Sequence, residues 1–287
     1  MSVVVTGATG HLGRLTIQHL LERGMQASEI IATGRSAEKL AELAAASGVA
    51  TAVIDYTQPE TLDAAFAGAR TLMFVSGSEA GQRIEQHRNV VDAAVRAGIS
   101  RIVYTSAPRA DTTTLILAPE HKATEEMIRQ TGISFTFLRN NWYTENYVGA
   151  FKQSRASGTY LASVGDGRVA SASRTDYAEA AAVVLTEEGH ENTVYELSGD
   201  VAWNGNELAA AFSRLAGSDI PYAPVTPEGH ADVLRSLGLD QGSVGFVVRL
   251  DGDTREGTLA ETSGDLSRLI GRPTTPLLEG LRQALSA

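Results

Sequence analysis

The chain has 287 residues, 43% of them apolar and 20% charged, with a formal net charge of −10. Because nucleic acids and anionic membranes attract proteins through basic faces, this acidic balance argues against both as partners. The sequence contains no cysteine, which excludes disulfides, thiolate metal ligands and a cysteine nucleophile. We therefore expect a soluble globular protein with a substantial apolar core.

The N-terminal residues and the hydropathy pattern indicate where in the cell the protein is expected. Ser2 leads directly into the apolar run Val3-Val4-Val5 with no basic segment before it, and no apolar run approaches the length of a membrane span. We expect an unprocessed, cytoplasmic protein that is not inserted in a membrane.

Short β-branched segments alternate with Ala-, Leu- and Glu-rich stretches through the first half of the chain. The expected strands cover residues 3–5, 30–33, 50–54, 71–75, 101–105 and 134–138, and one more covers 194–197. The stretches between them carry apolar residues at helical spacing, as in Leu12, Leu15 and Ile17. This alternation predicts an α/β fold with a doubly wound parallel sheet, whose ligand crevice lies beyond the carboxyl ends of the strands.

A glycine-rich segment, TGATGHLG, occupies residues 6–13, directly after the first strand and at the start of a helix. Glycines allow the backbone to turn and to approach a phosphate, and the helix N-terminus supplies N–H donors and a partial positive charge. The position favours a Rossmann fold of strand order 3-2-1-4-5-6, with the loop around a dinucleotide pyrophosphate. The expected contacts are Gly7, Ala8, Thr9, Gly10, His11, Leu12 and Gly13. In the alternative interpretation these glycines only shape a turn.

The end of the second strand indicates which dinucleotide binds. NAD-preferring sites place an acidic side chain there, whereas this chain has Gly34-Arg35-Ser36. The guanidinium of Arg35 can form charge-assisted hydrogen bonds with a 2′-phosphate, so we expect NADP rather than NAD. The alternative is a solvated surface arginine near a helix start.

The third and fourth strands end in further candidates for cofactor contact. Asp55 can accept from the adenine amino group, but its sequence context is equally typical of a turn or helix cap. Val75, Ser76 and Gly77 form a strand end of small residues that can pass under the ribose toward the nicotinamide. We also expect Gln86 and His87, and less firmly Asn89, to face this crevice.

The segment after the sixth strand supplies the candidate catalytic residues. Asn141 can donate to a developing oxyanion, while Trp142 and Tyr143 offer flat apolar faces with polar tips to a planar substrate. Alternatively, the aromatic pair is core packing and Asn140 is a helix cap. His121 can orient a ribose or relay a proton, although a lone histidine on a helix is more often structural.

The residues 7–13, 34–35, 86–89, 104–106 and above all LRNNWYTENY at 138–147 resemble the NmrA-like atypical short-chain dehydrogenases, and the likeness continues to residue 275. The resemblance implies NADPH in the crevice and two-electron reduction of a quinone without flavin or metal. It implies a homodimer more weakly. Carried over by position, the cofactor contacts would be Gly7 to Leu12, Arg35, Val75, Ser76, Gly77, Arg139, Asn140, Asn141, Trp142, Tyr143 and Thr144.

The sequence departs from ordinary short-chain dehydrogenases at their Tyr-x-x-x-Lys acid. Alignment on Glu125 places His121 at the lysine position and Leu117 at the tyrosine position. A quinone tolerates this loss, because hydride addition gives a phenolate-like oxyanion whose conjugate acid resembles tyrosine, with a pKa of about 10. The alternatives are an NADP(H)-sensing regulator without catalysis, or a carbonyl reductase, which would need the missing lysine. No metalloprotease, hydrolase or metal-ligand motif occurs.

The pattern weakens after residue 140, where glycine turns interrupt short helices. We expect residues 1–140 to form the NADP-binding Rossmann domain, with 171–200 returning to the sheet. Residues 141–170 and 201–287 would form a smaller, mainly helical substrate lobe. The segment 221–257 indicates two helices with uncertain limits.

Overall fold

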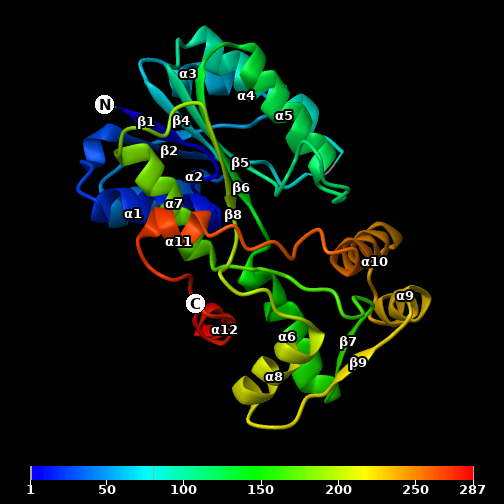
Figure 1. Ribbon diagram of the computed structural model, residues 1–287. Helices are drawn as coiled ribbons and strands as arrows, with labels where there is room; N and C mark the ends of the chain where they lie inside the picture. The colour runs from blue at the N-terminus through cyan, green and yellow to red at the C-terminus, as the bar shows by residue number, and fades with distance from the viewer. Residues whose placement is uncertain (1, 80, 287) are drawn as a thin grey trace.

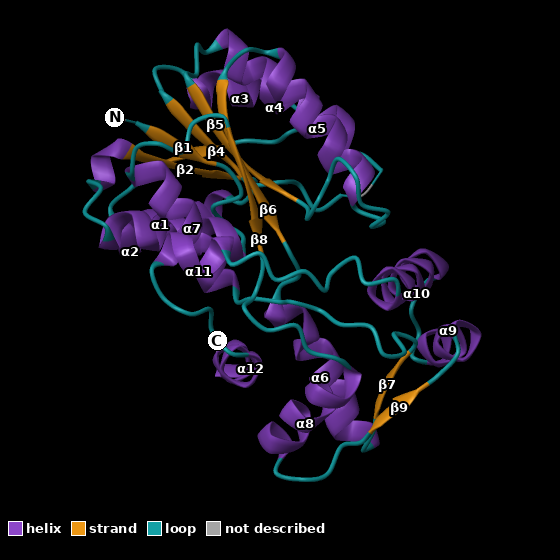
Figure 2. Ribbon diagram, viewed as in Figure 1, coloured by secondary structure: helices purple, strands orange, loops and turns teal. Residues whose placement is uncertain are grey.

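The computed structural model describes residues 2–79 and 81–286. Seven parallel strands form one sheet in the order β3-β2-β1-β4-β5-β6-β8 (Figures 1 and 2). They are β1 (Val3–Val5), β2 (Ile30–Gly34), β3 (Ala50–Val53), β4 (Thr71–Phe74), β5 (Arg101–Ser106), β6 (Ser134–Asn140) and β8 (Thr193–Leu197). The predicted order 3-2-1-4-5-6 is confirmed, and the strand expected at 194–197 extends the sheet beyond β6.

Helices cover both faces of this sheet. One face carries α1 (His11–Glu22), α2 (Ala37–Ser47), α7 (Arg174–Thr186) and α11 (Asp265–Ile270), and the other carries α3 (Pro59–Phe66), α4 (Arg83–Arg96) and α5 (Ala118–Gln130). Successive side chains of a strand point to opposite faces, so Val3 and Val5 join the core under α1, whereas Val4 joins the core under α3 and α4. A strand that is buried on both faces of the sheet therefore has a continuous run of apolar residues in the sequence.

The rest of the chain forms a smaller, mainly helical part below the carboxyl ends of the strands (Figure 1). It contains α6 (Val148–Ser157), α8 (Gly205–Ala216), α9 (Pro227–Ser236), α10 (Gln241–Arg255) and α12 (Leu277–Ser286), with the short parallel pair β7 (Tyr160–Ala162) and β9 (Tyr222–Pro224). The two helices expected within 221–257 are α9 and α10. The β7–β9 pair has no sequence signal strong enough to predict it.

The sixth strand is two residues longer than the sequence pattern predicts. Arg139 pairs in register with Glu196 and Asn140 with Leu197 of β8, so both belong to β6 and Asn140 is not a helix cap. Polar residues at a strand end look like a loop in the sequence, but a neighbouring strand satisfies their backbone groups here. No helix among the described residues is long and apolar enough to cross a membrane.

Candidate functional site

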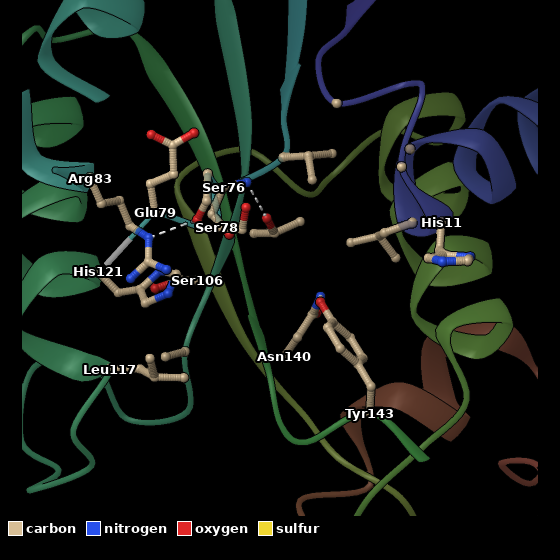
Figure 3. A pocket seen from close by; sticks show the side chains of 18 of the residues that line it. His11, Ser76, Ser78, Glu79, Arg83, Ser106, Leu117, His121, Asn140 and Tyr143 are labelled. Atoms are coloured by element: carbon tan, nitrogen blue, oxygen red, sulfur yellow. Dashed lines mark hydrogen bonds between the residues drawn. The ribbon is translucent and has the colours of Figure 1, made fainter. Parts of the chain in front are cut away.

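A cavity of about 470 Å³ lies at the carboxyl ends of β1, β2, β4, β5 and β6 (Figure 3). His11 and His121 lie on opposite sides of it, with Asn140 and Tyr143 between them. Most of the residues predicted for the site line this cavity. They are Gly7, Thr9, Gly10, His11, Leu12, Gly13, Arg35, Asp55, Val75, Ser76, Gly77, His121, Asn140, Asn141, Trp142 and Tyr143.

The glycine-rich loop has the shape that a pyrophosphate requires. Gly7 adopts φ +61°, and a Cβ on Gly13 would lie 2.4 Å from the carbonyl oxygen of Gly7. Gly10 is the N-cap of α1, where no side chain caps the helix and no acidic residue occupies the first turn. The backbone N–H groups of that turn have no partner within the helix. The loop therefore fits an anionic group at the N-terminus of α1.

Arg35 projects from the end of β2 and meets a carboxylate from the loop after β4. Its Nη1 donates to Glu79 Oε1 over 2.6 Å, and Gln86 Nε2 donates to Glu79 Oε2 over 2.9 Å. The hydrogen bond from Gln86, followed by that from Arg35, lowers the pKa of Glu79. Glu79 could not be predicted from the sequence, because no motif marks a single acid in a loop.

Asp55 lines the cavity but also serves the turn after β3. Its Oδ1 accepts from the backbone N–H of Thr57 over 2.8 Å and from the Thr57 hydroxyl over 2.7 Å, and these bonds lower the pKa of Asp55. These two hydrogen bonds agree with the turn interpretation, and they involve only one of the two carboxylate oxygens of Asp55. Tyr56, which was not predicted from the sequence, also lines the cavity, and its hydroxyl donates to the carbonyl of Val75.

The strand end after β4 is held by side chains on both flanks. Thr6 Oγ1 accepts from Val75 N–H, and Thr105 Oγ1 accepts from Ser76 N–H, each over 2.9 Å. Gly77 N–H donates to His87 Nε2 over 3.0 Å, so His87 lies behind Gly77 instead of lining the cavity. Asn89 is also turned away and donates to the carbonyl of Tyr56. Of the three residues expected from α4, only Gln86 lines the cavity.

His121 projects from α5 into the cavity, and its Nδ1 lies 2.7 Å from the hydroxyl of Tyr104. Burial, and secondly the charge of Arg83, lowers the pKa of His121 to about 3. Burial, followed by the charge of His121, lowers the pKa of His87 to about 2. Both imidazoles are therefore neutral at neutral pH.

Three predicted cofactor contacts lie outside the cavity lining. Ala8 is fully buried, and its N–H donates to the carbonyl of Thr33. Thr144 is also buried, with its hydroxyl 2.9 Å from Ser171 Oγ. The polar groups of these two residues are paired within the fold, and their contact with the cofactor stays a prediction.

Arg139 is the third of these residues. Its guanidinium donates to both oxygens of Glu125, and also to Glu196 and Asp111. Hydrogen bonds with these carboxylates raise the pKa of Arg139 against the opposing effect of burial. Arg139 thus joins β6 to α5 and β8, its side chain does not line the cavity, and its contact with the cofactor stays a prediction.

The last residue of β6 and the residues that follow it form the floor between the two ends of the cavity. Asn140 Nδ2 donates to Tyr143 Oη over 3.2 Å, which leaves the tyrosine hydrogen available to another acceptor, and Asn140 Oδ1 is buried without a partner among the described residues. Arg174 lies 4.8 Å from the centre of the Tyr143 ring. Asn141 Nδ2 donates to the carbonyl of Leu259, while its Oδ1 accepts from Trp142 N–H.

One end of the cavity is formed by apolar side chains. The lining there includes Ala107, Leu115, Leu117, Trp142 and Leu259, which belong to one apolar cluster, and Pro108 follows Ala107. Leu117 immediately precedes α5, one turn before His121, so the position of the usual tyrosine carries no hydroxyl (Figure 3). This end favours an uncharged, flat ligand over an ionic one. Within residues 2–79 and 81–286, no group of three or more His, Asp or Glu side chains is arranged to hold a metal ion.

Known proteins resemble this chain over almost its full length. Quinone oxidoreductase 2 of Escherichia coli (strain K12) is 42% identical over 279 residues, which cover 97% of this chain and 97% of that protein. The solved structure of Escherichia coli NADPH-dependent quinone oxidoreductase with NADPH matches with a TM-score of 0.94, at 42% identity over 99% of both chains. Citrobacter sp. triphenylmethane reductase with NADP(H) matches with a TM-score of 0.93, at 42% identity over 99% of this chain and 100% of that chain.

The glycine-rich loop, Gly34-Arg35 and the LRNNWYTENY segment are among the features on which the family resemblance rested. The model of the NmrA-like family matches residues 1–244, which include all three. The chain therefore belongs to the NmrA-like family.

Proposed function

We propose that this protein is an NADPH-dependent quinone oxidoreductase that transfers a hydride directly from NADPH to a quinone, without flavin or metal. The observation that carries the proposal is one cavity that joins a phosphate-binding loop and Arg35 to an uncharged apolar end. The relative that is 42% identical over 97% of both chains is named quinone oxidoreductase 2, which agrees with this chemistry.

The residues present fit NADPH along the cavity. The loop from Gly7 to Gly13 and the first turn of α1 would hold the pyrophosphate, and Arg35 would hold the 2′-phosphate. The strand end at Val75 to Gly77, with its backbone fixed by Thr6 and Thr105, would support the ribose and nicotinamide half. When bound, NADPH supplies the two electrons as a hydride.

The chain's own groups would position the acceptor and stabilise its developing charge. The indole of Trp142 and the apolar residues around it would hold a flat ring and exclude water. Asn141 Nδ2 has a second N–H that can donate to the oxyanion, and Tyr143 Oη has a hydrogen that its bond with Asn140 does not use. Burial raises the pKa of Tyr143, so this hydroxyl stays protonated at neutral pH.

The absence of a strong acid agrees with a quinone acceptor. His121 is neutral because its pKa is about 3, and Leu117 has no proton to give. A phenolate-like product needs little assistance, whereas the alkoxide formed from a simple ketone needs a proton donor in the transition state. An NADP(H) sensor without catalysis would leave the apolar end of the cavity with no ligand to bind.

The chain's organisation belongs to the same proposal. Residues 1–140, with 171–200 returning to the sheet, would form the cofactor-binding domain, and 141–170 with 201–287 the substrate lobe. Phe151, Tyr160 and Phe212 pack into a core separate from the two sheet cores, which supports this division. We further propose that the protein is a cytoplasmic homodimer. We also propose that it has no nucleic-acid partner, which the net charge of −10 supports.

The test is NADPH oxidation by the purified protein with a panel of quinones and with ketones of similar size. We expect quinone-dependent oxidation that is faster with NADPH than with NADH, and little reaction with the ketones. NADPH binding without turnover on any quinone would instead favour a sensor, and equal rates with ketones would require an acid that the cavity does not provide.

A further inference from the structure

Two buried histidines, one of which lines the cavity, pack against the same tyrosine. His87 comes from α4, His121 from α5 and Tyr104 from β5, and the tyrosine ring centre lies 5.7 Å from the first imidazole and 5.9 Å from the second. Tyr104 and His87 are fully buried, and His121 is nearly so. Because a neutral imidazole has one donor and one acceptor nitrogen, the tautomer decides what each histidine can bind.

The hydrogen bonds of His87 define its tautomer. The hydroxyl of Thr124 donates to the carbonyl of Glu120 over 2.8 Å, so its oxygen accepts from His87 Nδ1 over 2.9 Å. On the other side, Gly77 N–H donates to His87 Nε2 over 3.0 Å. His87 is therefore the Nδ1–H tautomer, with both nitrogens occupied in holding the fold.

The opposite assignment follows for His121. Burial raises the pKa of Tyr104 against the opposing effect of a side-chain hydrogen bond with Thr124, so the tyrosine keeps its proton, and a buried hydroxyl proton requires an acceptor. Thr124 Oγ1 already donates to the Glu120 carbonyl and accepts from His87 Nδ1, so we assign the acceptor role to Nδ1 of His121, 2.7 Å away. The imidazole proton is then on Nε2, which has no hydrogen-bond partner among the described residues, while the ring lines the cavity.

The charged groups around this pair also keep His121 neutral. Arg83 of α4 carries the nearest positive charge, and its own partner is Glu120 of α5 over 2.7 Å. Glu125, one turn after His121, is held by Arg139 and by the hydroxyl of Ser106. Both carboxylates are thus paired elsewhere, and neither is bonded to His121 to stabilise an imidazolium.

We propose that Tyr104 is a positioning residue that fixes His121 as the Nε2–H tautomer, so that His121 offers a hydrogen-bond donor to an oxygen atom of the molecule bound in the cavity. The donor keeps its proton throughout the reaction. The identity of that oxygen atom rests on the proposed function. It is either a carbonyl oxygen of the quinone or a hydroxyl oxygen of the cofactor ribose, and both are neutral oxygen acceptors for the same N–H donor.

Nitrogen-15 NMR of the histidine side chains tests the tautomers without any activity measurement. At neutral pH we expect two neutral imidazoles of opposite tautomer, with His87 protonated at Nδ1 and His121 at Nε2. The Tyr104→Phe variant should change the His121 signals and leave those of His87 in place. An Nδ1–H or a cationic His121 in the unmodified protein would overturn the proposal, whatever the protein catalyses.

Turnover tests the donor role. His121→Leu removes the donor, whereas His121→Gln keeps an N–H that can reach the same side of the cavity. We expect the Leu variant to lose roughly three- to tenfold in kcat/KM for the quinone or in affinity for NADPH, and the Gln variant to recover part of the loss. A loss confined to kcat/KM identifies the quinone oxygen as the acceptor, and a loss confined to NADPH affinity identifies the ribose.

Tyr195→Phe is a matched control, because the Tyr195 hydroxyl lies 2.7 Å from His190 Nδ1 at the far edge of the sheet. Tyr104→Phe should lower the same constant as His121→Leu, with the fold verified by circular dichroism, while Tyr195→Phe should leave it unchanged. Equal activity of the Leu variant and the unmodified protein would contradict the proposal. Absence of quinone turnover in the unmodified protein would refute the proposed function but not the tautomer assignment.

Discussion

Arg35 Nη1 donates to Glu79 Oε1 over 2.6 Å, and this ion pair joins the loops after β2 and β4 at the cavity lining. The guanidinium that we assign to the 2′-phosphate is therefore paired with a protein carboxylate. We therefore expect two side chains to set cofactor selectivity: Arg35 by attracting the 2′-phosphate and Glu79 by competing with it for Arg35.

Replacing Arg35 by aspartate should reverse the preference for NADPH over NADH. The substitution removes the charge-assisted hydrogen bond to the 2′-phosphate, worth about 1.5–3 kcal/mol, so NADPH affinity should fall roughly ten- to a hundredfold. The new carboxylate can accept from the ribose 2′-hydroxyl of NADH. Dissociation constants for both cofactors check this, and an unchanged ratio would remove Arg35 from the site.

Glu79→Gln should tighten NADPH binding several-fold and leave NADH binding nearly unchanged, because the variant no longer competes for Arg35. Glu85→Gln is the control, since it removes the same charge from an exposed position on α4 that does not line the cavity. Fluorescence titration measures both variants. Weaker NADPH binding in Glu79→Gln would mean that the carboxylate instead orients Arg35 for the phosphate.

Gly10→Val and Gly13→Val should fail in different ways. A Cβ at Gly10 meets only the Gly7 carbonyl oxygen, at 3.3 Å, so the fold should survive while the branched side chain blocks the pyrophosphate. A Cβ at Gly13 would lie 2.4 Å from that oxygen, so this variant should be unstable. Thermal unfolding and NADPH titration separate the two effects, and normal NADPH binding by a folded Gly10→Val would contradict the loop assignment.

Asn141→Ala should lower quinone turnover more than His121→Ala does. We propose that Asn141 donates to the oxyanion, and its side chain also forms hydrogen bonds with the Leu259 carbonyl and the Trp142 N–H. Replacement of His121 removes only one hydrogen-bond donor from the cavity. Loss of one oxyanion donor elsewhere costs about 10²–10³ in turnover, and a phenolate-like oxyanion should cost less. Steady-state rates at saturating NADPH decide the order. An inactive His121→Ala beside an active Asn141→Ala would reverse these roles.

The free energy of unfolding should fall as the pH drops below about 6.5, the ordinary histidine value. Burial lowers the pKa of His87 to about 2 and that of His121 to about 3 in the folded protein. At pH values between these folded-state pKa values and 6.5, the unfolded chain binds a proton on each histidine and the folded protein does not. The free energy of unfolding therefore decreases by about 1.4 kcal/mol per pH unit for each histidine as the pH falls. Urea unfolding at pH 7 and pH 5 measures this, and His121→Gln should show a shallower decline.

The sequence was sufficient for features that depend on local spacing. The glycine loop, the parallel strands and the end of β2 at Arg35 follow from periodicity and from residue types that permit one backbone geometry. The carboxylate partners of Arg139 could not be predicted, because they lie 14, 28 and 57 residues away along the chain and come together only in the folded protein. Glu79 and Tyr104 were missed for the same reason: each acts through a partner on another element.

Direct hydride transfer is the central claim, and the deuterium isotope effect on NADPH oxidation tests it most directly. The experiment uses protein verified to be free of flavin, a quinone at saturating concentration, and NADPH deuterated at one or the other C4 position. We predict a primary isotope effect for only one of the two positions, with one NADPH consumed for each quinone reduced. Quinone-dependent oxidation that requires added flavin, or that shows no isotope effect under single-turnover conditions with either label, would contradict the account.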